Sequence, residues 1–279
     1  MDITVTIPSR SRVRGLSALL HGMKFLESGR HRVHYGIACD DDDMETVNFC
    51  ADIKKYMHLG YSAQPRRPTL GDAFNEMAMH MPAQVYCMLN DDMLVLSDNW
   101  DECVAKAVEE TPHGVFWWSS AGPQFVLIPI ITEKWRAAQG GLFTSFFPFW
   151  YDDLCLAELW TMTTDADNIV LPIQAIDKPR TITTRMRELT FWQQVYNATR
   201  PLRVKQAYDM AEKLGLPRPQ CPEHLLVRLN EHVGNMSAER LDQIEANQGD
   251  REPPDEAYKA QKAKVLQMFP HLEAFSKAA

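Results

Sequence analysis

The N-terminal part of the chain alternates between short apolar runs and longer stretches in which apolar residues recur at helical spacing. The apolar runs, several of them β-branched, predict buried strands at residues 3–7, 33–38, 61–64 and 85–89. The stretches between them predict helices near 13–26, 45–57, 70–81 and 99–109. Pro8 is expected to stop the first strand. Strands and helices that alternate at this spacing predict an α/β fold with a parallel-rich sheet.

The later part of the chain is less regular and becomes helical toward its end. Two more strands and two more helices are expected, at 113–119, 125–132, 135–141 and 154–162. From residue 189 onward the pattern is largely helical, with breaks rich in proline and glycine at 217–222 and 249–254. We therefore predict a sheet-bearing domain over 1–188 and a mainly helical C-terminal module over 189–279.

Two adjacent carboxylates follow the strand predicted at 85–89, in the sequence Asn90-Asp91-Asp92. Ligands bind at the carboxyl ends of strands in open α/β sheets. Neighbouring carboxylates repel one another unless a cation lies between them, and Mg²⁺ or Mn²⁺ is suited to such oxygen ligands. We therefore expect Asp92, supported by Asp91, to bind a divalent metal. The alternative is a solvated turn, because Asn and Asp are ordinary turn residues.

Polar residues follow the first two predicted strands in the same way. Because parallel strands end at one edge of a sheet, that edge should also bring together Pro8, Ser9, Arg10 and the acids from Asp40 to Asp43. The acidic run alternatively forms a solvated helix start, where negative charge interacts favourably with the helix dipole. Only Asp40 or Asp41 would then reach a ligand, and Ser9 and Arg10 could be plain loop residues.

An aromatic loop at 146–151 precedes a second acidic pair, Asp152 and Asp153. Five aromatic residues in six are costly to expose, so the loop is expected either to pack or to stack on a sugar or a base. The acids could serve as a general base with a raised pKa in a partly dry pocket. Their alternative role is to stabilise the N-terminus of the helix that follows. Trp117 and Trp118 are expected to be sheet residues.

Composition indicates an unsecreted globular protein. The chain has 279 residues, 45% of them hydrophobic, which is ordinary for a globular protein. Its six cysteines are scattered and show no zinc-type spacing, so reduced thiols in the cytoplasm, or in a host cytoplasm for a viral protein, are expected. No signal peptide and no stretch long enough to span a membrane is evident.

Charge is unevenly distributed along the chain. The formal net charge is −8, which argues against a protein that coats nucleic acid. Residues 178–228 nevertheless contain ten Lys or Arg and four Asp or Glu, interleaved with Phe191, Trp192, Tyr196 and Tyr208. This segment could track phosphates and stack bases. The alternative is a basic helical face that offsets the acidic remainder.

The order of these motifs resembles that of GT-A-fold glycosyltransferases and is most similar to the large inverting family two and its relatives. The similarity covers residues 1–175 and rests on five segments, Ile7-Pro8-Ser9-Arg10, Asp40 to Asp43, Gly71-Asp72-Ala73-Phe74-Asn75, Asn90-Asp91-Asp92 and Trp150-Tyr151-Asp152-Asp153-Leu154, together with the strand, helix and Gly-Gly turn from Phe125 to Gly141. The resemblance implies a GT-A-like, Rossmann-type mixed sheet flanked by helices.

The resemblance also implies roles for individual residues. The donor nucleotide sugar would be bound by Pro8, Ser9, Arg10, Asp40, Asp41, Asp72, Asn75, Asn90 and Asp91, with Asp92 and Asp91 at the metal position and Asp152 or Asp153 as catalytic base. Arg10, Arg66 or Arg67 could add fixed positive charge against phosphate. The chain departs from the family pattern where Asn90 replaces the first acid of D-x-D, and a downstream histidine ligand is not evident.

These observations predict a metal-dependent transferase that moves a sugar from a nucleotide-diphosphate donor, a UDP-sugar foremost, to an acceptor hydroxyl with inversion. Losing one carboxylate at Asn90 should favour weak metal binding completed by donor phosphates. A hydroxymethylated pyrimidine in DNA is one acceptor hypothesis, which rests on residues 178–228. The alternatives are a non-catalytic nucleotide- or glycan-binding module of the same fold, and a nucleotidyltransferase. No Gly-rich, Lys-bearing loop follows the first strand, which argues against a nucleotidyltransferase.

Overall fold

The computed structural model describes residues 1–120, 128–177, 187–220, 236–247 and 253–276. Its contacts divide the chain into two compact units. The first comprises Met1–Arg67, Asp72–Leu142 and Asn168–Thr181, and the second Pro68–Gly71, Phe143–Asp167 and Ile182–Ala279. Residues 143–167 belong to the second unit, with the C-terminal helices. A domain boundary after residue 188 would instead place them with the sheet.

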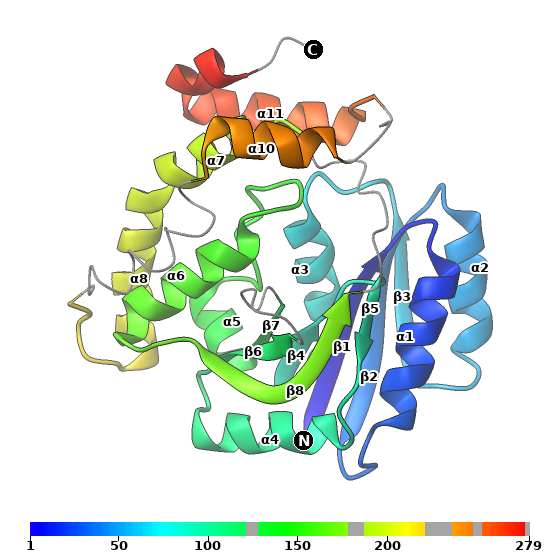
Figure 1. Ribbon diagram of the computed structural model, residues 1–279. Coiled ribbons are helices and arrows are strands. Elements are labelled where there is room, and N and C mark those ends of the chain that lie inside the picture. Colours follow the sequence, from blue (N-terminus) through cyan, green and yellow to red (C-terminus); the bar gives the residue numbers. More distant parts are fainter. Residues whose placement is uncertain (121–127, 178–186, 221–235, 248–252, 277–279) are drawn as a thin grey trace. The chain divides into compact units, whose positions relative to one another are not determined.

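The first unit is built on an eight-stranded mixed sheet with the order β3-β2-β1-β4-β7-β6-β8-β5 (Figure 1). The strands are β1 (Asp2–Ser9), β2 (Arg32–Asp40), β3 (Leu59–Gln64), β4 (Val85–Met88), β5 (Met93–Val95), β6 (Val115–Ser120), β7 (Pro129–Thr132) and β8 (Ile169–Asp177). Strands β3, β2, β1 and β4 are parallel, whereas β7 runs antiparallel to both β4 and β6. The predicted α/β class with a mixed, helix-flanked sheet is confirmed.

The described helices that follow strands of this unit include α1 (Val13–Phe25), α2 (Met44–Ile53), α3 (Leu70–His80), α4 (Trp100–Glu110) and α5 (Glu133–Gln139). Crossovers between parallel strands are right-handed. The steps from β1 to β2 and from β2 to β3 go the same way along the sheet, so α1 and α2 share one face and contact each other. The step from β3 to β4 goes back past β2 and β1, which puts α3 on the other face, where Met77 packs with Ala38 of β2.

Two strands differ from expectation at prolines. Strand β1 does not stop at Pro8 but continues to Ser9, with Pro8 opposite Ala38. On the side that faces β4, strand β1 is paired only from Ile3 to Thr6. Pro8 lies beyond this paired stretch, so its lack of an N–H removes no hydrogen bond to β4. Strand β8 was not predicted at all. Its Pro172 lies at a register irregularity opposite β6, the kind of site where a strand tolerates proline.

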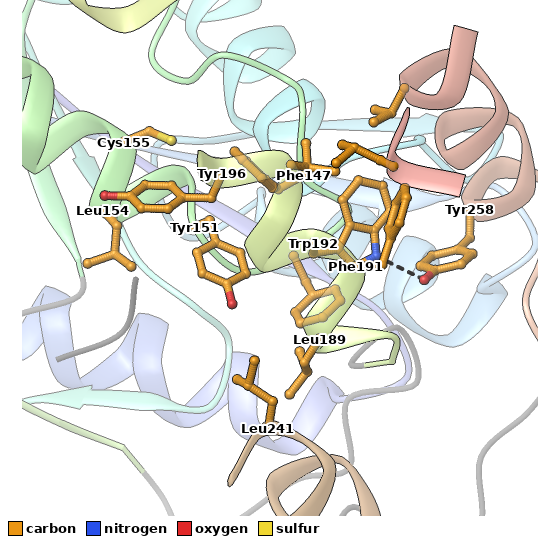
Figure 2. Packing of buried hydrophobic residues seen from close by; sticks show 14 residues of the cluster. Phe147, Tyr151, Leu154, Cys155, Leu189, Phe191, Trp192, Tyr196, Leu241 and Tyr258 are labelled. Atoms are coloured by element: carbon orange, nitrogen blue, oxygen red, sulfur yellow. Dashed lines mark hydrogen bonds between the residues drawn. The ribbon is translucent and has the colours of Figure 1, made fainter. Parts of the chain in front are cut away.

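The second unit contains the helices α6 (Asp152–Thr164), α7 (Leu189–Ala198), α8 (Arg200–Leu214), α10 (Ala238–Ala246) and α11 (Glu256–Met268) and the 3₁₀ helix η2 (Pro270–Phe275). Its core joins the aromatic loop at 146–151 to α6, α7, α10, α11 and η2 (Figure 2). Phe147 and Tyr151 of the loop are 1% exposed and pack with Trp192 and Tyr196 of α7. The loop therefore packs. Across the described part of both units, no helix combines the length and apolarity needed to cross a membrane.

Candidate functional site

The parallel strands β1, β2 and β4 bring their polar C-terminal residues to one edge of the sheet. Ser9 ends β1 opposite Cys39 of β2, directly before Asp40. Asn90 follows β4, whose last paired residue, Met88, lies opposite Thr6. This edge therefore holds the end of β1, the acidic run and the Asn90-Asp91-Asp92 turn together, as the strand pattern predicts.

Asp91 is buried in this edge and is not part of a solvated turn. The residue is 3% exposed, and its carboxylate accepts hydrogen bonds from Ser9 Oγ at 2.8 Å and from Arg12 Nη1 at 3.0 Å. Burial raises the pKa of Asp91, while the positive charge of Arg12 and the Ser9 hydroxyl oppose that rise. The two partners thus compensate a carboxylate that has left water.

Arg12 also binds the neighbouring carboxylate. The same Nη1 atom lies 3.1 Å from Asp92 Oδ2, and the Asp92 side chain is 24% exposed. Arg12 is the residue that precedes helix α1. In the helix's first turn, a Cβ added to Gly15 would lie 2.6 Å from the backbone oxygen of Asp91, so glycine is required for this close approach. The start of α1 is packed directly against the acidic turn.

The donor atoms of this turn suit a hard cation only in part. Both Asp91 oxygens already accept hydrogen bonds from Ser9 and Arg12, and the backbone carbonyl oxygen of Asn90 accepts one from the Met93 N–H. Asp92 is thus the more accessible oxygen ligand. Within the described residues, no three His, Cys, Asp or Glu side chains are grouped as a metal site. The residues fit a cation whose remaining ligands come from another molecule.

Asp40 lies among three arginines at the end of β2. Its carboxylate accepts a hydrogen bond from Arg10 at 2.9 Å, and Arg66 and Arg67 come within 3.8 Å of it. Arg10 also binds Asp42. The hydrogen bonds that Arg10 donates to Asp42 and the negative charge of both carboxylates raise the pKa of Arg10. This cluster is partly exposed, with 14% of the Asp40 side chain accessible.

Two neighbouring residues of the cluster are structural. Asp43 caps helix α2 through Thr46, and it accepts the backbone N–H of Ser11 at 2.6 Å, which fixes the loop after β1. Arg67 is 8% exposed and donates to Glu76 of α3 and to the Cys39 carbonyl of β2. Arg67 therefore holds α3 against the sheet. Of the arginines considered as phosphate ligands, Arg10 and Arg66 are the more exposed.

The other residues expected to bind the donor nucleotide sugar lie in different surroundings. Asn75 of α3 accepts the backbone N–H of Leu142 through Oδ1, and a Cβ on Gly141 would lie 2.9 Å from the same atom. Asn75 therefore holds the turn after α5. Asp72 lies in the first turn of α3 and Asp41 is exposed. Contact of these residues and of Pro8 with a donor stays a prediction.

The second acidic pair lies in the first turn of α6, within the second unit. Asp152 is 6% exposed, and its Oδ1 accepts a hydrogen bond of 3.3 Å from Thr144. Asp153 accepts the N–H of Leu154 through Oδ1. Burial among protein atoms raises the pKa of Asp153 to about 6, although backbone hydrogen bonds oppose the rise. The pair thus starts a helix, and burial holds the pKa of Asp153 above that of an ordinary aspartate.

The backbone that leads into the pair is held by the C-terminal helices. Gln261 of α11 is 4% exposed, and its amide donates to the carbonyls of Ser145 and Phe146. Tyr151, the residue before α6, has φ 79° and stacks on Tyr196 at 5.4 Å between ring centroids. Figure 2 shows Tyr151 and Tyr196 within the cluster that also contains Trp192 and Tyr258. Sequence periodicity gave no signal for Gln261 or for Arg12, because neither contact follows a local spacing.

Several described residues of the basic segment are buried or paired within the second unit. Phe191, Trp192 and Tyr196 are at most 1% exposed, so they are not available to stack bases. Arg203 and Arg200 both pair with the buried Glu158. Residues 178–186 and 221–228 of this segment lie outside the described residues. Trp117 and Trp118 of β6 are buried in the sheet as expected.

Comparison with known proteins shows the fold. The chain resembles the mannosyltransferase PcManGT from Pyrobaculum calidifontis, solved in complex with GDP-Man and Mn²⁺, with 14% identity, a TM-score of 0.55 and coverage of 98% of this chain and 85% of that one. It also resembles S. aureus TarS 1-349 in complex with UDP-GlcNAc, with 11% identity, a TM-score of 0.56 and coverage of 99% and 84%. No family model matches the chain, and neither does any curated protein. The fold is thus of the GT-A glycosyltransferase type.

Proposed function

We propose that this protein is a glycosyltransferase that moves a sugar from a nucleotide-diphosphate sugar to an acceptor hydroxyl. The observation that carries the proposal is the Asn90-Asp91-Asp92 turn at the carboxyl end of β4, anchored by Ser9 and Arg12. In open α/β sheets this edge binds ligands. The similar structures contain GDP-Man, UDP and UDP-GlcNAc, which supports a nucleotide-sugar donor. A UDP-sugar is the first donor to test.

The donor's diphosphate gains negative charge as the glycosidic bond breaks. Mn²⁺ or Mg²⁺, when bound, offsets that charge as a Lewis acid. Asp92 would hold the ion because it is the more accessible carboxylate of the turn, and Asp91 would support it from the buried side. The PcManGT structure contains Mn²⁺, which favours manganese for the first trial. Arg10 and Arg66, beside Asp40, are the partly exposed cations available for the nucleotide.

The acceptor hydroxyl must lose its proton as it attacks the anomeric carbon. We assign this role to Asp153, with Asp152 as the competing assignment. A pKa of about 6 leaves the Asp153 carboxylate ionised at pH 7 and makes it more basic than an ordinary aspartate. Direct attack assisted by one base would invert the configuration at the anomeric carbon.

The acceptor hypothesis rests on the charge of residues 178–228. A hydroxymethylated pyrimidine in DNA remains one hypothesis, now resting on the basic residues of 178–228 without the buried aromatic residues Phe191, Trp192 and Tyr196. DNA binding through phosphates weakens steeply with salt. A gel-shift titration between about 50 and 200 mM salt tests this, since binding that is absent, or indifferent to salt, contradicts phosphate contact.

The primary test is calorimetric binding of UDP, GDP and TDP with and without Mn²⁺. We expect one nucleotide to bind in the presence of Mn²⁺ and Asp92→Asn to weaken that binding. Asp52→Asn is the matched control, because Asp52 is exposed on α2 and pairs only with Lys55 among the contacts described. Unchanged sugar turnover in Asp92→Ala would refute the metal assignment. If no nucleotide binds under any condition, the non-catalytic binding module is the better description.

A further inference from the structure

We infer that Arg12 is a built-in counter-cation that competes with a divalent metal for Asp92, so that metal binding depends on the arrival of the nucleotide. The dependence of metal binding on the nucleotide rests on the proposed function. The competition between Arg12 and a metal for Asp92 involves only residues of the sheet edge. Arg12 Nη1 lies 3.0 Å from Asp91 Oδ1 and 3.1 Å from Asp92 Oδ2, so one nitrogen bridges both carboxylates.

The bridge places a positive charge where the two carboxylates would otherwise attract a cation. Opposite charges about 3 to 4 Å apart near a protein surface attract each other strongly, because the effective dielectric constant there is well below that of water. A metal that binds Asp92 must displace or share this charge, because two cations at one carboxylate repel each other. Asp91 compensates only in part, because its two oxygens already accept hydrogen bonds from Ser9 and Arg12.

The position of Arg12 is fixed by its neighbours along the chain. Arg12 directly precedes α1, and Gly15 in the first turn of that helix lies against the Asp91 backbone. Ser11 on its other side is held by Asp43. The backbone on both sides of Arg12 is therefore anchored to the same edge, which keeps its side chain within reach of the two carboxylates.

A diphosphate changes this balance in two ways. Its oxygens can complete the coordination shell of the metal, and a guanidinium binds phosphate well. Arg12 then exchanges its carboxylate partners for phosphate as the metal takes Asp92. Wild-type protein should consequently bind Mn²⁺ weakly by itself and more tightly once the nucleotide is present.

The test measures Mn²⁺ alone, by the loss of the free-ion electron paramagnetic resonance signal. Arg12→Gln should bind Mn²⁺ at least tenfold more tightly than wild type, and Arg12→Lys should stay close to wild type because it keeps the charge. Arg14→Gln is the matched control, since it removes the same charge from an exposed position of α1. Equal Mn²⁺ affinity in wild type and Arg12→Gln overturns the inference.

A second pair of variants guards against failure of Arg12→Gln to fold, because that change leaves Asp91 buried without its cation. Asp91→Asn with Arg12→Gln removes both charges and keeps Asp92. It should bind Mn²⁺ more tightly than Asp91→Asn alone, and equal affinities would contradict competition.

UDP or GDP is added in a separate arm. We expect the nucleotide to tighten Mn²⁺ binding more in wild type than in Arg12→Gln. If no nucleotide binds, the proposed function fails while the comparison with Mn²⁺ alone still decides whether Arg12 competes. If nucleotides bind but tighten Mn²⁺ binding equally in both proteins, the dependence on the nucleotide is wrong.

Discussion

The hydroxyl of Ser9 donates a 2.8 Å hydrogen bond to Asp91, and both residues are buried. This bond joins the end of β1 to the turn after β4 inside the sheet edge. Ser9→Ala removes the donor and leaves a desolvated carboxylate oxygen, so we expect a loss of about 1–3 kcal/mol in the free energy of unfolding. Urea denaturation measures it. Ser17→Ala, on α1, should stay within about 0.5 kcal/mol, and a similar small effect for Ser9→Ala would show that the bond contributes little.

Two glycines of α1 give opposite predictions for the same substitution. Gly15→Ala would put Cβ 2.6 Å from the Asp91 backbone oxygen, which requires α1 or the turn to move. We expect it to destabilise the protein by about 1–3 kcal/mol and to weaken nucleotide binding. At Gly22 an added Cβ would have no atom within 4 Å, so Gly22→Ala should stabilise by about 0.4–1 kcal/mol. Thermal unfolding of both variants is the measurement, and equal shifts would argue against the close approach.

How far the sequence could reveal this site depends on the range of each contact. Strand ends are visible in the apolar pattern, so the common edge of Ser9, Asp40 and Asp91 could be predicted from parallel pairing. Arg12 could not, because its role comes from the loop that turns its side chain toward residues about eighty positions away. Strand β8 was missed for a related reason, since Pro172 is tolerated only at an irregularity that the fold creates.

The pH dependence of activity should report the acidic pair. With a pKa of about 6, Asp153 loses its proton as the pH rises through that value, so kcat/KM should rise there and level off above it. Asp153→Asn should remove this limb together with most activity. If the limb and the activity persist in Asp153→Asn but vanish in Asp152→Asn, the base is Asp152.

The same carboxyl predicts a pH effect on stability. Its pKa is raised from 3.8 to about 6, so the folded state holds the proton more tightly than the unfolded chain. The stabilisation is therefore complete below the lower value and is lost as the pH rises through the higher one. Asp153→Asn should flatten the stability curve between about pH 4 and 6. A curve identical to that of wild type would show that burial does not shift this group.

The buried ion pair of the second unit should be costly to break on one side only. Arg203 donates to Glu158 at 2.7 Å, and both side chains are at most 3% exposed. Arg203→Met leaves the carboxylate with Arg200 at its edge and should cost about 3–5 kcal/mol, whereas Arg203→Met with Glu158→Met should recover much of the loss. Denaturant unfolding checks both. Lys259→Ala, which breaks an exposed pair on α11, should change stability by less than about 1 kcal/mol.

Gln261 gives a test of how α11 supports the aromatic loop. Gln261→Ala leaves the carbonyls of Ser145 and Phe146 without this donor, so amide hydrogen exchange across 144–151 should accelerate. Gln267→Ala is the control, because Gln267 is exposed on the same helix. Unchanged exchange in Gln261→Ala would mean that packing alone holds the loop.

The bond from Gln261 also sets an order of events during synthesis. The loop and the acidic pair at 152–153 leave the ribosome more than a hundred residues before the helix that clamps them. Their backbone cannot acquire its final hydrogen bonds until α11 has emerged and folded. The nascent chain must therefore carry the aromatic side chains of this loop without their final partners, and chaperone capture is expected to concentrate in that interval.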